Sequence, residues 1–173
     1  MEPQRHPSRR NLLVWLAGAA PVSLLAQTPS FATPGQAELR GVTSGGEVLA
    51  LNTLRGQVVM VFYWSTECPV CRNKMPELRA NAAGWQGQKF TLLGVNMDQK
   101  REDFLRYEEV VTPLLPQEQL FPSVWGRDPA YQDNLGPVSH LPSTVLIDKQ
   151  GQVAERYMGR IPPQAWNRIA DLL

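Results

Sequence analysis

Cys68 and Cys71 are the only cysteines in the 173-residue chain, and two residues separate them in the sequence Cys68-Pro69-Val70-Cys71. They follow the continuously apolar run 58–64, which is typical of a strand buried on both faces. If that strand leads through a short turn into a helix, Cys68 lies at the helix N-terminus, where free backbone N–H groups and the helix dipole favour a thiolate. The spacing therefore predicts thiol–disulfide redox chemistry.

Two other uses of a cysteine pair remain open. A structural zinc site needs about four protein ligands, whereas this chain offers no third cysteine and only two histidines, His6 and His140. A permanent disulfide across so short a loop would add little stability, because the benefit grows with loop length. Redox chemistry is the favoured interpretation, and metal binding is the main alternative.

The composition indicates one small domain. The chain is 43% hydrophobic and carries 17 basic against 16 acidic side chains. This balance gives no indication of a nucleic-acid partner.

The N-terminal segment has the pattern of an export signal. Arg9 and Arg10 follow a serine and precede an apolar stretch that runs to Ala26, and Ala32 ends a small-residue cleavage pattern. The paired arginines resemble a twin-arginine signal, although an ordinary secretory signal has a similar basic end. We predict an export signal at 1–32, a linker at 33–41 and a folded domain at 42–173.

The apolar stretch is short for a permanent anchor, which needs about 20 residues, and it contains Gly18 and Pro21. The domain is therefore expected in the periplasm, and it would be tethered to the membrane only if the signal stays uncleaved.

Strand and helix patterns alternate along the remaining chain, which predicts a mixed sheet with helices on both faces. Pro76 should kink the first helix. The proline-rich segment 111–138 has no clear assignment, and a Gly-containing turn at 148–151 indicates a β-hairpin. The expected strands are 47–51, 58–64, 90–95, 144–147 and 153–158, the expected helices are 69–83 and 99–109, and a last helix should bury Trp166, Ile169, Ala170 and Leu173.

Several short motifs together resemble the thioredoxin fold in its TlpA-like (ResA-like) bacterial branch. The resemblance covers about 41–173. Its motifs are the sequence 64–72 around the cysteines, Met75-Pro76-Glu77-Leu78, Leu141-Pro142-Ser143-Thr144, and Leu146-Ile147-Asp148 with Gly151.

The resemblance implies a role for each matching residue. Cys68 corresponds to the nucleophile that attacks a substrate disulfide, and Cys71 to the resolving cysteine. Pro142 corresponds to the cis-proline that faces the cysteines, and Leu141 would pair its backbone with the substrate chain. The implied fold is α/β, a central mixed sheet flanked by helices, with the TlpA-like insertion between a βαβ half and a cis-Pro ββα half.

Three positions depart from the family pattern. Phe62 stands where relatives often have Asp or Asn, Glu67 replaces a frequent Trp, and Lys74 replaces an acidic residue. A buried carboxylate that could deprotonate the resolving thiol is therefore missing from the strand that contains Phe62, and Glu67 becomes a candidate for proton transfer.

Three other residues near the motifs could have either a functional or a purely structural role. His140 could approach the cysteines, but a loop histidine without a chemical role is favoured. Trp64 and Trp125 are candidates for substrate binding, although Trp64 belongs to an apolar strand and core packing is its default role.

The resemblance implies a monomeric disulfide reductase for exported client proteins, such as apocytochrome c or copper-site proteins. It needs no cofactor beyond the redox-active Cys68–Cys71 disulfide, and a membrane electron donor of the thiol-disulfide type would return it to the reduced state. The alternative is a Cu(I)-binding chaperone module that uses the same cysteines, since soft thiolates suit that ion.

Overall fold

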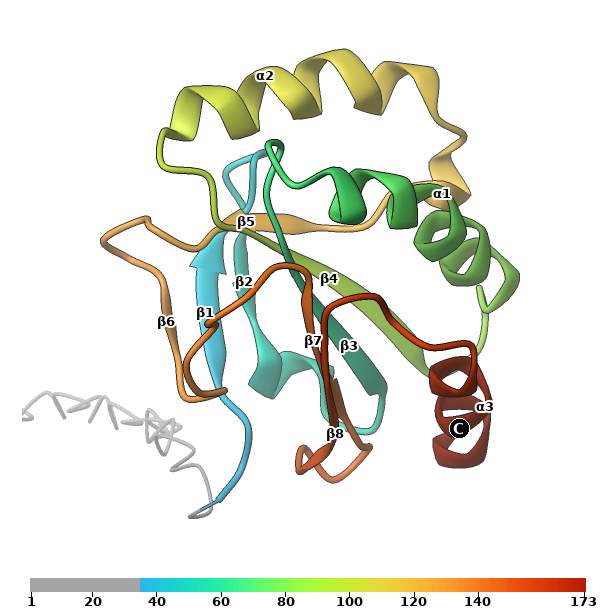
Figure 1. Cartoon of the computed structure of the whole chain (residues 1–173). Helices are drawn as coiled ribbons and strands as arrows, with labels where there is room; N and C mark the ends of the chain where they lie inside the picture. The colour runs from blue at the N-terminus through green and yellow to red at the C-terminus, as the bar shows by residue number, and fades with distance from the viewer. Residues whose placement is uncertain (1–34) are drawn as a thin grey trace, which may run out of the picture. The chain divides into compact units, whose positions relative to one another are not determined.

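The computed structural model describes residues 35–173, so the predicted export signal lies outside the described residues. Two sheets form the framework (Figure 1). The larger has the strand order β5-β4-β3-β7-β8 and the smaller the order β2-β1-β6. The strands are β1 (Leu39–Val42), β2 (Val48–Ala50), β3 (Val58–Trp64), β4 (Phe90–Asn96), β5 (Ser123–Trp125), β6 (Gln132–Asp133), β7 (Ser143–Ile147) and β8 (Val153–Met158).

Strand β3 lies at the centre of the larger sheet and is buried along its whole length. It runs parallel to β4 and antiparallel to β7, while β4 runs parallel to β5 and β7 antiparallel to β8. The carboxyl end of β3 therefore lies beside the beginning of β7. This arrangement brings the cysteine turn and the segment before β7 to the same edge of the sheet.

Alternate residues of β3 face two separate cores. Met60, Phe62 and Trp64 face the core that contains the buried residues of α1 (Pro69–Gly84), α2 (Arg101–Val111) and α3 (Gln164–Leu172). Val59, Val61 and Tyr63 face a second core with residues of the smaller sheet. The predicted mixed sheet flanked by helices is confirmed, but the described α-helices pack on one face of it, because the smaller sheet covers the other face.

Helix α1 begins at Pro69, contains Pro76 and ends at Gly84. Proline at the first helical position loses no hydrogen bond, because a backbone N–H at that position would have no intrahelical partner. The helix bends along its course in Figure 1, as expected for an internal proline that removes one backbone bond.

The unassigned segment 111–138 contains four short elements besides the end of α2. These are the 3₁₀ turns Thr112–Leu114 and Gln117–Gln119 and the strands β5 and β6. With α2 they form the insertion between β4 and β7. The predicted strand 47–51 corresponds to β2, which ends at Ala50, and a 3₁₀ turn, Leu51–Leu54, follows it.

Two predictions from the sequence need correction: the end of the linker and the buried face of the last helix. The linker 33–41 runs into β1, and Ala37 and Leu39 are already buried. In α3 the deepest residues are Ala165 and Ile169, whereas Ala170 is exposed. The first error arose because a four-residue strand after proline and glycine gives a weak pattern, and the second because the predicted buried face began at Trp166 and so left out Ala165.

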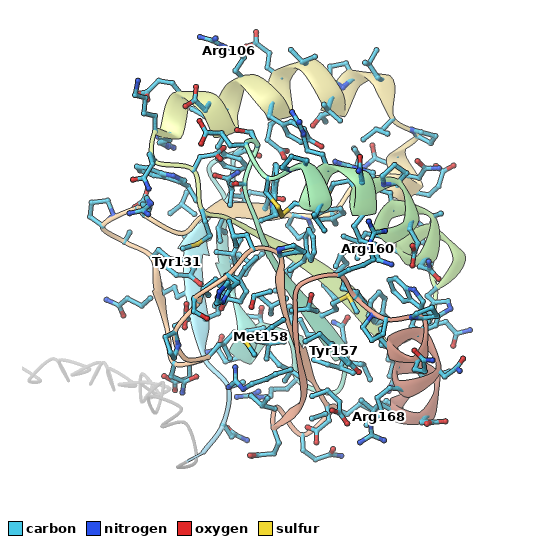
Figure 2. The ribbon with its side chains drawn as sticks, viewed as in Figure 1. Arg106, Tyr131, Tyr157, Met158, Arg160 and Arg168 are labelled. Atoms are coloured by element: carbon cyan, nitrogen blue, oxygen red, sulfur yellow. A yellow bond between two sulfur atoms is a disulfide. The ribbon has the colours of Figure 1, made fainter. Side chains whose placement is uncertain are left out.

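Buried Tyr63 and half-buried Tyr131 connect the smaller sheet to β3. The hydroxyls of Tyr63 and Tyr131 both donate to the carboxylate of Asp133 in β6, and Tyr131 lies beside β1 and β6 in Figure 2. Burial first, and then the Asp133 charge, raises the pKa of Tyr63 above its ordinary value. Tyr131 also has a raised pKa, mainly through burial. Both hydroxyls therefore stay protonated and act as donors.

Candidate functional site

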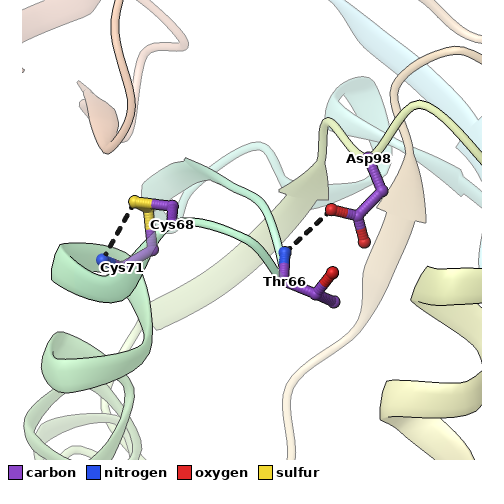
Figure 3. Close-up of a disulfide and its surroundings, with 4 residues drawn as sticks. All are labelled: Thr66, Cys68, Cys71 and Asp98. Carbon is purple, nitrogen blue, oxygen red and sulfur yellow. Dashed lines mark hydrogen bonds between the residues drawn. A yellow bond between two sulfur atoms is a disulfide. The ribbon is translucent and has the colours of Figure 1, made fainter.

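Cys68 and Cys71 are joined by a disulfide at the start of α1 (Figure 3). Cys68 is the N-cap residue, and its sulfur accepts a hydrogen bond of 3.1 Å from the backbone N–H of Cys71. The Cys68 carbonyl accepts the N–H of Arg72 at 3.1 Å. A backbone donor aimed at sulfur, together with the positive end of the helix dipole, stabilises negative charge on Cys68.

The two sulfurs differ in access. Cys71 is fully buried and belongs to the core around Phe62 and Met75. Cys68 is half-buried, and Val70 between them is 38% exposed. A disulfide or thiol of another protein can therefore reach Cys68 but not Cys71, and the nucleophile and resolving roles implied for them stay predictions.

Pro142 lies in the segment that leads into β7. The Leu141–Pro142 peptide bond is cis, and the Pro142 carbonyl accepts a hydrogen bond of 2.8 Å from the Gly159 N–H at the end of β8. Leu141 is half-buried and packs against both cores. Met158, paired in register with Ser143, is 76% exposed and lies on β8 in Figure 2. The hydrogen bond from Gly159 to Pro142 and the packing of Leu141 thus hold this loop at the edge of the sheet where the cysteine turn lies.

Trp64 is wrongly placed among the substrate-binding candidates. It is completely buried, and its ring packs against Phe104 and Tyr107 of α2 at centroid distances of 6.4 and 4.8 Å. The apolar strand around it already favoured core packing. Trp125 is half-buried, and its indole N–H donates to the Asp98 carbonyl at 2.8 Å.

Asp98 is a site residue that the sequence interpretation missed. It is 5% exposed, and one carboxylate oxygen accepts the Thr66 N–H at 2.8 Å (Figure 3). The other oxygen accepts the Asn96 amide at 3.0 Å, and the Asn96 side-chain oxygen accepts the Asp98 N–H at 3.0 Å. Asp98 therefore fixes the turn two residues before Cys68. An acidic residue two positions after the end of a buried parallel strand was the available signal, because such strands end at the edge where sites form.

Glu67 and His140 line one hollow of about 250 Å³ beside the cysteine turn, which also includes Asp98 and Arg127. Both candidate side chains are exposed, and the His140 ring nitrogen lies 3.0 Å from the Ser139 hydroxyl. The structure places Glu67 next to Cys68 and His140 near Pro142, and the proposed proton transfer by Glu67 stays a prediction.

Lys74 is buried one helical turn beyond Cys71, and its ammonium lies 2.7 Å from the Glu77 carboxylate. The indole N–H of Trp166 donates to the same carboxylate at 2.7 Å. Burial alone would raise the pKa of Glu77, but the hydrogen bonds from Lys74 and Trp166 lower it overall. The carboxylate is thus charged at neutral pH and compensates the Lys74 charge.

Within residues 35–173, no group of three or more His, Cys, Asp or Glu side chains is placed to hold a metal ion. No helix in this same range is long and apolar enough to cross a membrane.

The fold and the cysteine turn define the thioredoxin class of proteins. A structure from Chlorobium tepidum, described as a putative thiol:disulfide interchange protein DsbE, has the same fold with a TM-score of 0.60, 24% sequence identity, and coverage of 78% of this chain and 89% of that chain. Residues 25–164 match the model of the AhpC/TSA family, so the chain belongs to that family.

Two curated relatives support the TlpA-like (ResA-like) resemblance. Thiol-disulfide oxidoreductase ResA of Halalkalibacterium halodurans is 26% identical over 74% of this chain and 69% of its own length. Thiol:disulfide interchange protein DsbE of Pseudomonas aeruginosa is 30% identical over 65% of this chain, and this chain spans only 57% of that protein. The resemblance is confirmed, and the names of these relatives agree with the predicted enzyme class, a protein-disulfide oxidoreductase.

Proposed function

We propose that the protein is a periplasmic thiol-disulfide oxidoreductase that reduces disulfides in exported client proteins through Cys68 and Cys71. The observation that carries this proposal is the difference between the two sulfurs. Cys68 is half-buried at the helix N-cap and accepts the Cys71 N–H, whereas Cys71 is fully buried behind it. This geometry suits an attacking thiolate and a resolving thiol.

The reaction has two exchange steps. The Cys68 thiolate attacks a client disulfide, so a mixed disulfide forms and one client thiolate leaves. Cys71, once deprotonated, then attacks the Cys68 sulfur, which forms the Cys68–Cys71 disulfide and releases the second client thiolate. The client gains two electrons and two protons, and the enzyme loses them. A dithiol donor must then reduce the enzyme.

The surroundings of Cys68 favour the reductase direction. Pro69 offers no N–H, and Glu67 places a negative charge beside the nucleophile, while Arg72 one turn along supplies a positive charge. Lys74 adds little positive charge to the site, because Glu77 compensates it. The helix N-terminus and the Cys71 N–H stabilise the Cys68 thiolate, but the adjacent Glu67 charge opposes them. A thiolate less stabilised than that of a strong oxidant leaves the disulfide form relatively stable, which is the property of a reductant.

Equilibration with glutathione tests this direction. We expect a reduction potential nearer about −270 mV, the thioredoxin value, than about −120 mV, that of a strong oxidant. The reduced protein should also accelerate disulfide reduction in a model substrate such as insulin. A potential above about −160 mV, or no acceleration, would contradict the reductase. Stoichiometric Cu(I) binding without disulfide turnover would instead support the chaperone alternative.

The proposed partners follow from the reaction. Clients supply disulfides, and because the periplasm is kept oxidising, a membrane donor of the thiol-disulfide type must supply electrons. We propose that the enzyme works as a monomer and needs no cofactor besides its own disulfide.

Export rests on the residues before the described part. We propose that Arg9 and Arg10 belong to a twin-arginine signal within 1–32. Changing both to lysine should leave precursor in the cytoplasm, as fractionation and immunoblotting would show. Unchanged export of the double variant would indicate the general secretory route.

A further inference from the structure

Thr144 carries a buried hydroxyl without a partner. The residue is 1% exposed, and its Oγ1 has no hydrogen-bond partner within the described part of the chain. An unpaired buried polar group is costly, and a native structure rarely retains one without a reason. One such reason is a partner that forms only in another state of the protein.

The sheet register places this hydroxyl on the core face that contains Cys71. Thr144 lies directly opposite Phe62 in the antiparallel pair of β7 and β3, so both side chains point to the same face. Phe62 and Cys71 belong to one packed core, as does Leu146, two residues along β7 on this face. Thr144 also lies near the carboxyl end of β3, from which the cysteine turn leads into α1.

Phe62, the strand neighbour of Thr144, has no polar group to offer a buried thiolate. Trp64 has an unpartnered indole N–H on the same face, but its ring packs against α2. Among the described residues, Thr144 is therefore the buried hydroxyl without a partner, and it lies on the core face that contains Cys71.

We propose that the Thr144 hydroxyl donates a hydrogen bond to the Cys71 sulfur in the reduced protein and so positions and stabilises the resolving thiolate. This inference rests on the proposed redox function. Reduction by an external dithiol breaks the Cys68–Cys71 bond, adds two electrons and two protons to the protein, and converts the dithiol to a disulfide. Cys71 then becomes a thiol that ionises to a strong acceptor, whereas the disulfide sulfur is a weak one.

A donor that pairs only with the reduced form shifts the redox equilibrium toward that form. Replacing Thr144 by valine keeps the β-branched shape and removes the hydroxyl. We expect the equilibrium constant for reduction by glutathione to fall about tenfold in Thr144→Val, which corresponds to about 30 mV more negative. Thr144→Ser keeps the donor and should remain close to the wild type.

Thermal unfolding of both redox forms gives a second readout. Because valine removes an unpaired hydroxyl from the oxidised protein, oxidised Thr144→Val should melt at or above the wild-type temperature, while the reduced variant should melt below the reduced wild type. If the melting temperatures of both redox forms shifted equally and the reduction potential stayed unchanged, Thr144 would have only a structural role and the proposal would be overturned.

These measurements separate this proposal from the proposed function. The potential and the melting temperatures are obtained on the isolated protein without any client. A wild type that fails to reduce disulfides would refute the function, whereas a normal wild type whose potential is unaffected by Thr144→Val would refute only the Thr144 hydrogen bond.

Discussion

Cys71→Ser is expected to accumulate a covalent complex with client proteins, because Cys68 can still attack a disulfide and no second thiol remains to release it. Catalysed insulin reduction should fall to the uncatalysed rate. Nonreducing gels followed by peptide mass spectrometry would show the mixed disulfide and identify its enzyme cysteine as Cys68.

Cys68→Ser is the matched control. It should also lack activity, but it should form no mixed disulfide, because Cys71 is fully buried and cannot meet a client. Equal trapping by the two variants would contradict the assigned order of attack.

Asp98→Ala is expected to have the second largest effect. The change leaves the half-buried Thr66 N–H and the buried Asn96 amide without their carboxylate acceptor. Since each hydrogen bond to a charged group is worth about 1.5–3 kcal/mol, we expect a loss of about 3 kcal/mol in the free energy of unfolding. Displacement of the turn before Cys68 should also slow catalysed reduction on the order of tenfold to a hundredfold.

Asp103→Ala provides the comparison for Asp98. It removes the same side chain from an exposed position in the first turn of α2 and should cost less than about 1 kcal/mol. Denaturant unfolding and insulin reduction measure both effects. If Asp98→Ala matched Asp103→Ala in stability and rate, Asp98 would not hold the cysteine turn.

The sequence predicted the parts of the fold that have a strong local pattern. Strand β3 has the predicted bounds, and α1 begins at Pro69 as expected because a proline, a change of period and a buried strand before it all agree. The hairpin of β7 and β8 was likewise evident from the turn residues, and Gly151 there has a φ of 80°, which favours glycine.

What the sequence could not show depends on contacts between distant segments. Asp98 meets Thr66 across 32 positions, and Trp125 reaches Asp98 across 27. The register that sets Thr144 opposite Phe62 likewise brings together residues that are remote in the chain. Strand β1 is short and has no helix-like or strand-like repeat of its own, so only its pairing with β2 and β6 defines it.

The most direct test of the central claim is the alkylation rate of each thiol in the reduced protein at mildly acidic pH, followed by peptide mass spectrometry. Cys68 is half-buried at the N-cap, whereas Cys71 is fully buried. We therefore expect iodoacetamide to modify Cys68 at least about tenfold faster than Cys71, since the thiolate is the reacting species. Equal rates, or faster modification of Cys71, would contradict the assignment of Cys68 as the attacking thiol.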